Sequence, residues 1–242
     1  NEVEHILFFV GEKAPAIPDP PRGLRVIDMP KRDPFSIGHC HNYGARLANT
    51  EWIMKIDVDT LPSLMFFRKL IPLIVESRPR EWFNCGMLYF KPIYSCSLLS
   101  LEKVPICSVV HHMVCQNASL YSAGMYHAPA ATNFICRTQD YLDLGGCDDR
   151  FNGWGWEDYQ QIYMMERYQQ TKDPLPGLVN LENVTRRCRD EISRRKASEL
   201  FSRDEAFCLF HRWHPTPPRD RHSVDANRAV LFDFIQRSRN SV

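Results

Sequence analysis

Residues 52–59 read Trp52-Ile53-Met54-Lys55-Ile56-Asp57-Val58-Asp59, an apolar run that ends in two acids. A short and nearly all-apolar run of this kind is typical of a buried strand. Two aspartates that lie two positions apart at the end of a strand point to the same side of the sheet. This stretch therefore predicts a buried strand whose carboxyl end presents a pair of carboxylates.

The segments before this stretch predict the fold class. Short apolar runs at 6–10 and 24–27 predict two more strands, joined by a proline-rich loop at 13–23. Residues 37–48 predict a helix with Ser36 as its N-cap. One face of this helix follows the i, i+3, i+4 spacing and carries Ile37, Cys40, His41, Gly44, Leu47 and Ala48. Two strands, a helix and a strand that ends in acids indicate an open α/β sheet with its ligand site at the strand ends.

The rest of the chain continues the mixture of helices and strands. The sequence predicts a helix at 64–75 that Pro72 kinks or ends, a strand at 82–90, strands and loops in 92–137, a helix at 157–170 and a last strand at 207–210. The segment 186–203, rich in both charges, is typical of an exposed helix with internal salt bridges. Neither an internal repeat nor a linker is visible, which favours one composite domain.

Composition excludes several classes of protein. The chain has 242 residues, 44% of them hydrophobic, and a formal net charge of +1. It is therefore neither disordered nor fibrous, and its charge predicts no nucleic-acid partner. No apolar run is long enough for a membrane span. Nine cysteines without a CxxC pair favour free thiols and a cytoplasmic location. The alternative is a lumenal catalytic domain whose anchor was removed, with sequons at Asn117 and Asn183.

The acids after the strand suggest metal chemistry. Asp57 and Asp59 supply hard oxygen ligands, which can hold Mg²⁺ or Mn²⁺ on the phosphates of a nucleotide. The alternative is that the two aspartates only form a solvated turn. The apolar strand that precedes them makes a pair of charges without a function less expected. His211, just after the last predicted strand, is a possible third ligand, but a histidine there can also simply pack or face solvent.

A second motif occupies residues 144–158, which read LGGCDDRFNGWGWED. Alternating glycines and tryptophans allow tight turns and present flat aromatic faces, on which sugar rings can stack. Glu157 and Asp158 begin the predicted helix, where the helix dipole keeps a carboxylate ionised and able to accept a hydroxyl proton. In the alternative interpretation, Trp154 and Trp156 belong to the core and the two acids only cap the helix.

Together these motifs resemble the GT-A glycosyltransferases, in particular the inverting enzymes of family 2 and the galactosyltransferase type with a GWGxED segment. The resemblance covers roughly residues 36–59 and 141–215. It implies a Rossmann-like fold with a mixed, mostly parallel open sheet flanked by helices. It also implies a single glycosyltransferase domain over residues 1–242, with a nucleotide-sugar half at about 1–90 and an acceptor half at about 91–242.

The resemblance assigns roles to individual residues. It implies that Asp59 binds Mn²⁺ or Mg²⁺ directly, that Asp57 contacts the metal or the ribose, and that His211, rather than His214, is the late metal ligand. Acceptor recognition falls to Trp154, Trp156 and Glu157, and the general base is Asp158. On the donor side, Glu12 is a candidate contact to the base or ribose, and His41 and Asn42 replace the Arg-Asn pair that contacts the diphosphate in the family.

These roles predict a metal-dependent enzyme that transfers a sugar from a nucleotide donor, a UDP-sugar, to a hydroxyl of a saccharide or glycoprotein. A single displacement with one base predicts inversion at the anomeric carbon. A sugar nucleotidyltransferase is a rival of similar fold, but the sequence lacks the glycine-rich basic loop that would hold a triphosphate. The other rivals are a non-catalytic carbohydrate-binding relative and a metal-dependent phosphoesterase.

Overall fold

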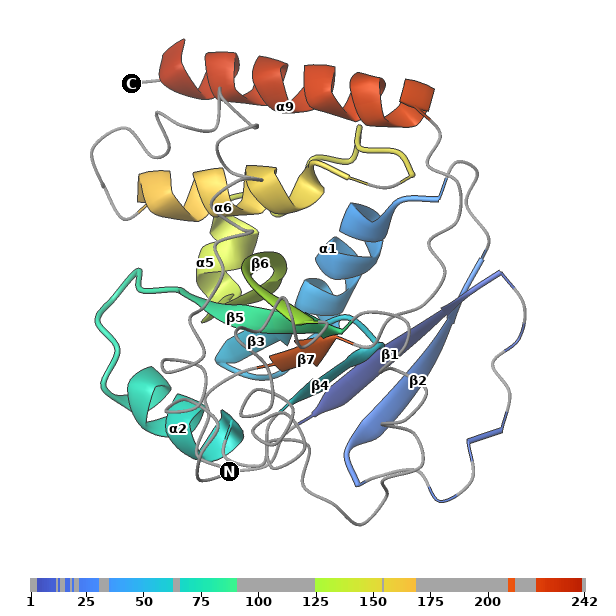
Figure 1. Cartoon of the computed structure of the whole chain (residues 1–242), viewed down its shortest axis with the longest axis vertical. Coiled ribbons are helices and arrows are strands. Elements are labelled where there is room, and N and C mark those ends of the chain that lie inside the picture. Colours follow the sequence, from blue (N-terminus) through green and yellow to red (C-terminus); the bar gives the residue numbers. More distant parts are fainter. Residues whose placement is uncertain are drawn as a thin grey trace. The chain divides into compact units, whose positions relative to one another are not determined.

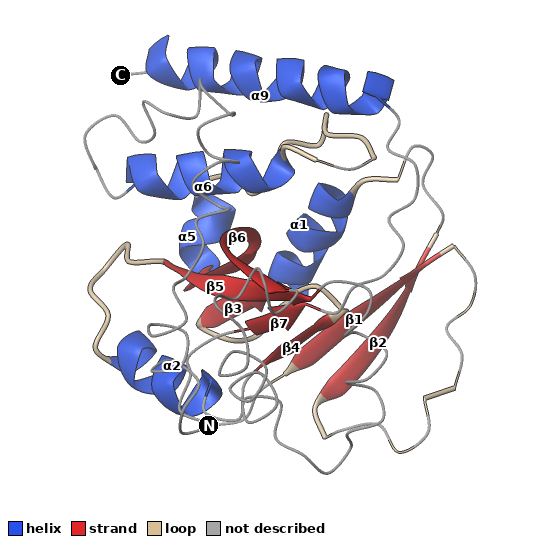
Figure 2. Cartoon of the chain, viewed as in Figure 1, coloured by secondary structure: helices blue, strands red, loops and turns tan. Residues whose placement is uncertain are grey.

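The computed structural model describes residues 4–11, 13, 16–17, 19, 22–30, 35–62, 66–90, 125–153, 155–168, 209–211 and 221–240. Figure 2 colours their helices and strands. The chain divides into two compact units, each built from separate segments. The first contains Asn1–Ile53, Cys136–Thr171 and Pro217–Val242, and the second contains Met54–Ile135 and Lys172–Thr216. The segments of the two units therefore alternate along the sequence. The expected single domain, with a nucleotide-sugar half and an acceptor half, stays a prediction.

The first unit begins with two strands and a helix. Strands β1 (His5–Val10) and β2 (Leu24–Met29) pair in parallel over their whole length. Helix α1 (Ile37–Leu47) follows, and its N-cap Ser36 accepts a hydrogen bond from the backbone N–H of His39 at 3.3 Å. The strands predicted at 6–10 and 24–27 and the capped helix predicted at 37–48 are thus confirmed. The buried face of α1 is polar at one position, because Asn42 lies on it beside Gly38, Cys40 and Ala45.

Three further helices of the first unit lie within the described residues. They are α5 (Thr138–Asp143), α6 (Glu157–Tyr168) and α9 (Arg221–Asn240). Figure 1 shows α6 and α9 side by side, and the rings of Tyr163 and Phe234 meet edge to face between them at 6.3 Å. The helix predicted at 157–170 is α6, whereas no element was predicted over α9. Leu231 and Ile235 of α9 are buried, so this helix contributes directly to the core.

The second unit is organised around a mixed sheet of five strands in the order β3-β6-β5-β7-β4. These strands are β3 (Trp52–Lys55), β4 (Thr60–Pro62), β5 (Phe83–Phe90), β6 (Met125–Arg137) and β7 (Leu209–His211). Strands β3 and β6 each cross from one unit to the other. The rings of Phe90 and Phe210 stack at 6.1 Å and are both almost fully buried, which places the core of this unit at β5 and β7.

The pairing in this sheet differs from the mostly parallel arrangement that was expected. β5 is parallel to β7 but antiparallel to β6, and β4 is antiparallel to β7. In addition, β1 and β2 form a separate two-stranded sheet. The predicted predominance of parallel pairs is therefore not seen among the described strands. An apolar pattern marks a segment as a strand, but its partner and direction depend on contacts with distant segments.

Helix α2 (Phe66–Val75) connects β4 to β5 and was predicted at 64–75. Pro72 lies inside it without ending it, on an exposed face where water can solvate the backbone carbonyl that the proline leaves unbonded. The helix buries Phe66 and Leu70. Within the described ranges, no helix combines the length and apolar character needed to cross a membrane. The charged segment 186–203 lies outside the described residues.

Candidate functional site

The two acids that follow β3 lie in a tight turn at residues 57–60, which we call the aspartate turn. The backbone N–H of Thr60 donates to the carbonyl of Asp57 at 3.0 Å and closes this turn. Val58, between the acids, is 88% exposed. Antiparallel pairing of β4 with β7 sets Thr60 opposite His211. The turn therefore projects from the sheet edge at the point where β7 ends.

This pairing brings together two of the predicted metal ligands. The Nε2 atom of His211 lies 3.4 Å from Oδ2 of Asp59, and both side chains keep some solvent exposure. A carboxylate beside an imidazole is a donor pair that suits Mn²⁺ and also Mg²⁺. The described residues nevertheless contain no group of three or more His, Cys, Asp or Glu side chains that could hold a metal ion. Asp57 as a further ligand stays a prediction, and His214 lies outside the described residues.

The second predicted motif forms a loop between α5 and α6, which we call the Gly-Trp loop (residues 144–156). Buried amide side chains from three helices hold it, and the first is Asn42 of α1. Asn42 donates from Nδ2 to the carbonyl of Cys147 at 2.7 Å. Its Oδ1 accepts from the backbone N–H of Cys147 at 2.7 Å and from the Tyr141 hydroxyl at 2.9 Å. Burial raises the pKa of Tyr141, so that hydroxyl stays protonated and able to donate.

The other two amides come from α6 and α9. Gln160 accepts from the backbone N–H of Asp148 at 2.9 Å and donates to the carbonyl of Gly146 at 3.3 Å. Asn227 accepts from the backbone N–H of Asn152 at 2.9 Å. It also donates to the carbonyls of Asn152 at 2.7 Å and Gly155 at 3.1 Å. Both ends of the loop are thus fixed by hydrogen bonds to its backbone.

Close packing and an ion-pair network add to these bonds. A Cβ on Gly38 would lie 2.3 Å from Sγ of Cys147, so α1 approaches the loop more closely than any side chain would permit. Arg150 forms ion pairs with Asp148 of the loop and with Asp233 of α9, and these two carboxylates raise its pKa. Arg237 joins the same network through Asp233 at 2.8 Å.

The end of the loop has an unusual backbone. Gly153 (φ 70°), Gly155 (φ 105°) and Trp156 (φ 77°) all have positive φ angles. For tryptophan this left-handed conformation costs about 1–2 kcal/mol. The Trp156 ring packs against Tyr159 of α6 at 5.6 Å. Non-glycine residues in this conformation cluster at functional sites, where the surrounding structure holds them in place.

The two acids that follow Trp156 differ in accessibility. Glu157 is only 2% exposed, whereas Asp158 is partly exposed in the first turn of α6. Only an accessible carboxylate can accept a proton from a substrate hydroxyl, so Asp158 is the better placed of the two for a base. Trp154 lies outside the described residues.

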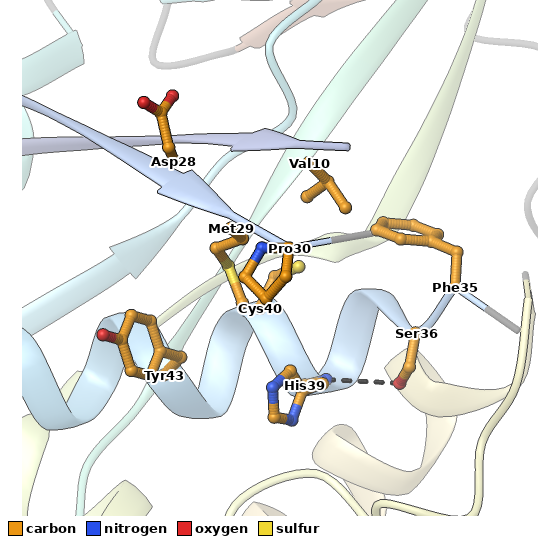
Figure 3. A pocket seen from close by; sticks show the side chains of 9 residues that line it. All are labelled: Val10, Asp28, Met29, Pro30, Phe35, Ser36, His39, Cys40 and Tyr43. Carbon is orange, nitrogen blue, oxygen red and sulfur yellow. Dashed lines mark hydrogen bonds between the residues drawn. The ribbon is translucent and has the colours of Figure 1, made fainter. Parts of the chain in front are cut away.

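A cavity of about 430 Å³ lies where β1 and β2 meet the start of α1 (Figure 3). Its lining is mainly apolar and includes Val10, Phe35 and Tyr43, together with Asp28, His39 and Cys40. Burial raises the pKa of the Cys40 thiol, which favours its neutral form. Glu12, the predicted contact to a base or ribose, lies outside the described residues.

A comparison with protein families matches a stretch of the chain that includes both the aspartate turn and the Gly-Trp loop. A family model described as glycosyltransferase-like family 2 matches residues 22–232. The chain belongs to this glycosyltransferase family. Membership implies a GT-A fold and supports glycosyl transfer as the general activity, with a nucleotide-sugar donor and an acceptor as substrates. No curated protein matches the chain.

In this family 2 glycosyltransferase, the two residues of α1 that were predicted to contact the donor, His41 and Asn42, differ from each other in their surroundings. Asn42 is buried, and its oxygen is already used by two donors inside the protein. Its predicted contact with a donor diphosphate therefore has no support from its surroundings. His41, its neighbour, is half-buried, and its contact with the diphosphate stays a prediction.

Sequence reasoning missed the amides that hold the Gly-Trp loop of this glycosyltransferase. Gln160 is 1% exposed on a face of α6 that also buries Glu157 and Met164, and Asn227 is 1% exposed on a helix that was not predicted. A signal for the missed helix was present, because Val224, Asn227, Leu231, Phe234 and Ile235 follow helical spacing. A polar residue within such a stripe marks a buried hydrogen-bonding position.

Proposed function

We propose that this family 2 glycosyltransferase transfers the sugar of a UDP-sugar to a hydroxyl of a saccharide or glycoprotein acceptor, with Mn²⁺ or Mg²⁺ and with inversion of the anomeric carbon. The observation that carries the proposal is the 3.4 Å contact between Asp59 and His211 beside the exposed aspartate turn. These residues are far apart in the sequence, and the sequence by itself makes both of them candidate ligands of the same metal.

The donor set fits a divalent cation. In the proposal, Asp59 and His211 hold the ion, and Asp57 contacts the ion or the ribose. When bound, the metal neutralises charge that develops on the departing diphosphate.

On the acceptor side, the proposal gives separate roles to three residues of the loop and helix. Trp156 stacks on a sugar ring, as aromatic side chains in carbohydrate sites do. Asp158 accepts the proton of the acceptor hydroxyl while the oxygen attacks the anomeric carbon from the face opposite the nucleotide. Its position in the first turn of α6 favours the ionised carboxylate that this role needs. Glu157, being buried, orients this segment instead of exchanging protons with the acceptor.

Two substitutions separate donor binding from transfer. Wild-type protein should gain thermal stability from UDP only when Mn²⁺ is also present, because a ligand that binds the native state stabilises it. Asp59→Asn should lose this gain. Asp158→Asn should keep it but release no UDP from UDP-sugars when saccharide acceptors are added. Asp143→Asn, on the exposed end of α5, is the matched control and should behave as wild type.

The outcomes that contradict the proposal are specific. A stability gain from UDP and Mn²⁺ that survives in Asp59→Asn would remove the metal role of Asp59. Transfer at the wild-type rate by Asp158→Asn would exclude it as the base. A gain in thermal stability from GDP or CMP, and none from UDP, would show that the donor is not a UDP-sugar. A product that retains the anomeric configuration of the donor, observed by proton NMR, would exclude inversion.

A further inference from the structure

The side-chain amide of Asn227 forms hydrogen bonds with a backbone turn of the kind that two backbone segments usually form with each other. Its amide accepts from the N–H of Asn152 at 2.9 Å and donates to the carbonyl of the same residue at 2.7 Å. A third bond reaches the carbonyl of Gly155 at 3.1 Å. Asn227 is 1% exposed, so these bonds are shielded from water on the side of α9. One side chain of α9 thus spans the turn that leads into Trp156.

This turn needs such support because its own conformation is unfavourable. Gly153, Gly155 and Trp156 have positive φ angles, and tryptophan rarely adopts one. On its other side, the N–H of Gly153 donates to the carbonyl of Phe35 at 2.5 Å. A strained backbone persists only where surrounding contacts hold it, and Asn227 supplies three of the bonds described at this turn.

We propose that Asn227 is a positioning residue, which fixes residues 152–156 in the conformation that presents Trp156 and Asp158 to the acceptor. The inference rests on the proposed function, because it assigns acceptor recognition to Trp156 and proton transfer to Asp158. It adds the C-terminal helix α9 to the elements that build the acceptor site. The family match includes Asn227, since it extends to residue 232.

Asparagine is suited to this position because its side chain has one acceptor and one donor group in a plane, as a peptide has. Asn227→Asp keeps the size and the acceptor but replaces the donor that reaches the two carbonyls. Asn227→Ala removes all three bonds. Asp225→Asn changes an exposed side chain two residues away on α9 and serves as the matched control.

The test combines hydrogen exchange with kinetics. In both Asn227 variants, amides within residues 152–156 should exchange faster than in wild type, while those of α1 stay protected and show that the fold persists. Initial rates are measured with UDP-glucose, Mn²⁺ and methyl β-D-glucoside as the acceptor. We expect kcat/KM for the acceptor to fall by about 100-fold, because small misplacements of catalytic groups have effects of this size. The KM for UDP-glucose should stay within about twofold of wild type.

Several results would overturn the inference. Unchanged exchange at 152–156 in Asn227→Ala would show that Asn227 does not hold the turn. Faster exchange with normal acceptor kinetics would show that the turn conformation does not matter for transfer. Wild-type behaviour of Asn227→Asp would remove the role of the donor group. Wild-type protein that transfers no sugar from any of the UDP-sugars offered to any of the saccharide acceptors offered would contradict the proposed function, whereas the exchange measurement would still decide whether Asn227 holds the turn.

Discussion

The Gly-Trp loop and the aspartate turn carry the two halves of the proposed chemistry but are built in different ways. Neutral amides from three helices hold the loop through its backbone, and Asn42 and Asn227 are almost fully buried. The turn is closed by one described backbone hydrogen bond, and its Asp59 contacts His211. Val58 at its tip is 88% exposed.

This difference has a physical consequence. Amides do not titrate, so the hydrogen bonds that Asn42, Gln160 and Asn227 make to the loop keep their strength as pH changes. A carboxylate and an imidazole change charge, and their interaction also depends on salt and on any bound cation. We therefore expect the loop to be preformed and to contribute strongly to stability. The aspartate turn should contribute little to stability and respond mainly to ligands.

The largest expected effect comes from Gly146→Ala in the loop. Gly146 has φ 68°, and a Cβ there would lie 2.3 Å from Oδ1 of Asn42. Strain and the clash together should lower the free energy of unfolding by about 3 kcal/mol or more, as measured in urea. Gly145→Ala is the control, because Gly145 has φ 83° but no atom within 4 Å of the added Cβ. It should cost only about 1 kcal/mol. Equal losses for the two variants would contradict a tightly packed loop.

A smaller loss is expected from Asn42→Ala. It leaves the N–H and carbonyl of Cys147 and the hydroxyl of Tyr141 without their bonds to Asn42. Unfolding in urea should show a loss of about 2–3 kcal/mol, because buried polar groups that lose their partners are costly. UDP and Mn²⁺ should still stabilise the variant. If stability were unchanged but the effect of UDP were lost, Asn42 would instead be the diphosphate contact that the sequence suggested.

The smallest expected effect is that of His211→Gln in the presence of a chelator. His211 and Asp59 are partly solvated, and such pairs contribute about 0–1 kcal/mol. The free energy of unfolding should therefore change by no more than about 1 kcal/mol. The same variant should lose the stability gain from UDP with Mn²⁺. A loss of stability as large as that of Asn42→Ala would show that the turn is a structural element like the loop.

Much of the local structure was predictable from sequence, because it depends on neighbouring residues. The apolar runs that became β1, β2 and β3 and the helical spacing of α1 and α6 fixed these elements within a few residues. The Gly-Trp motif and the aspartates likewise identified both candidate regions. Helix α9 was missed although Leu231, Phe234 and Ile235 follow helical spacing with Asn227.

Sequence alone therefore determined several of the strands and helices, the two candidate motifs and, through their resemblance, the family. Only the tertiary structure decided that β5 lies antiparallel to β6, that Asp59 meets His211, and that Asn42 serves the loop. The physical reason is the range of the interactions. Periodicity and backbone preferences act over a few residues and are written in the local sequence, whereas strand partners and buried hydrogen bonds join residues that only folding brings together.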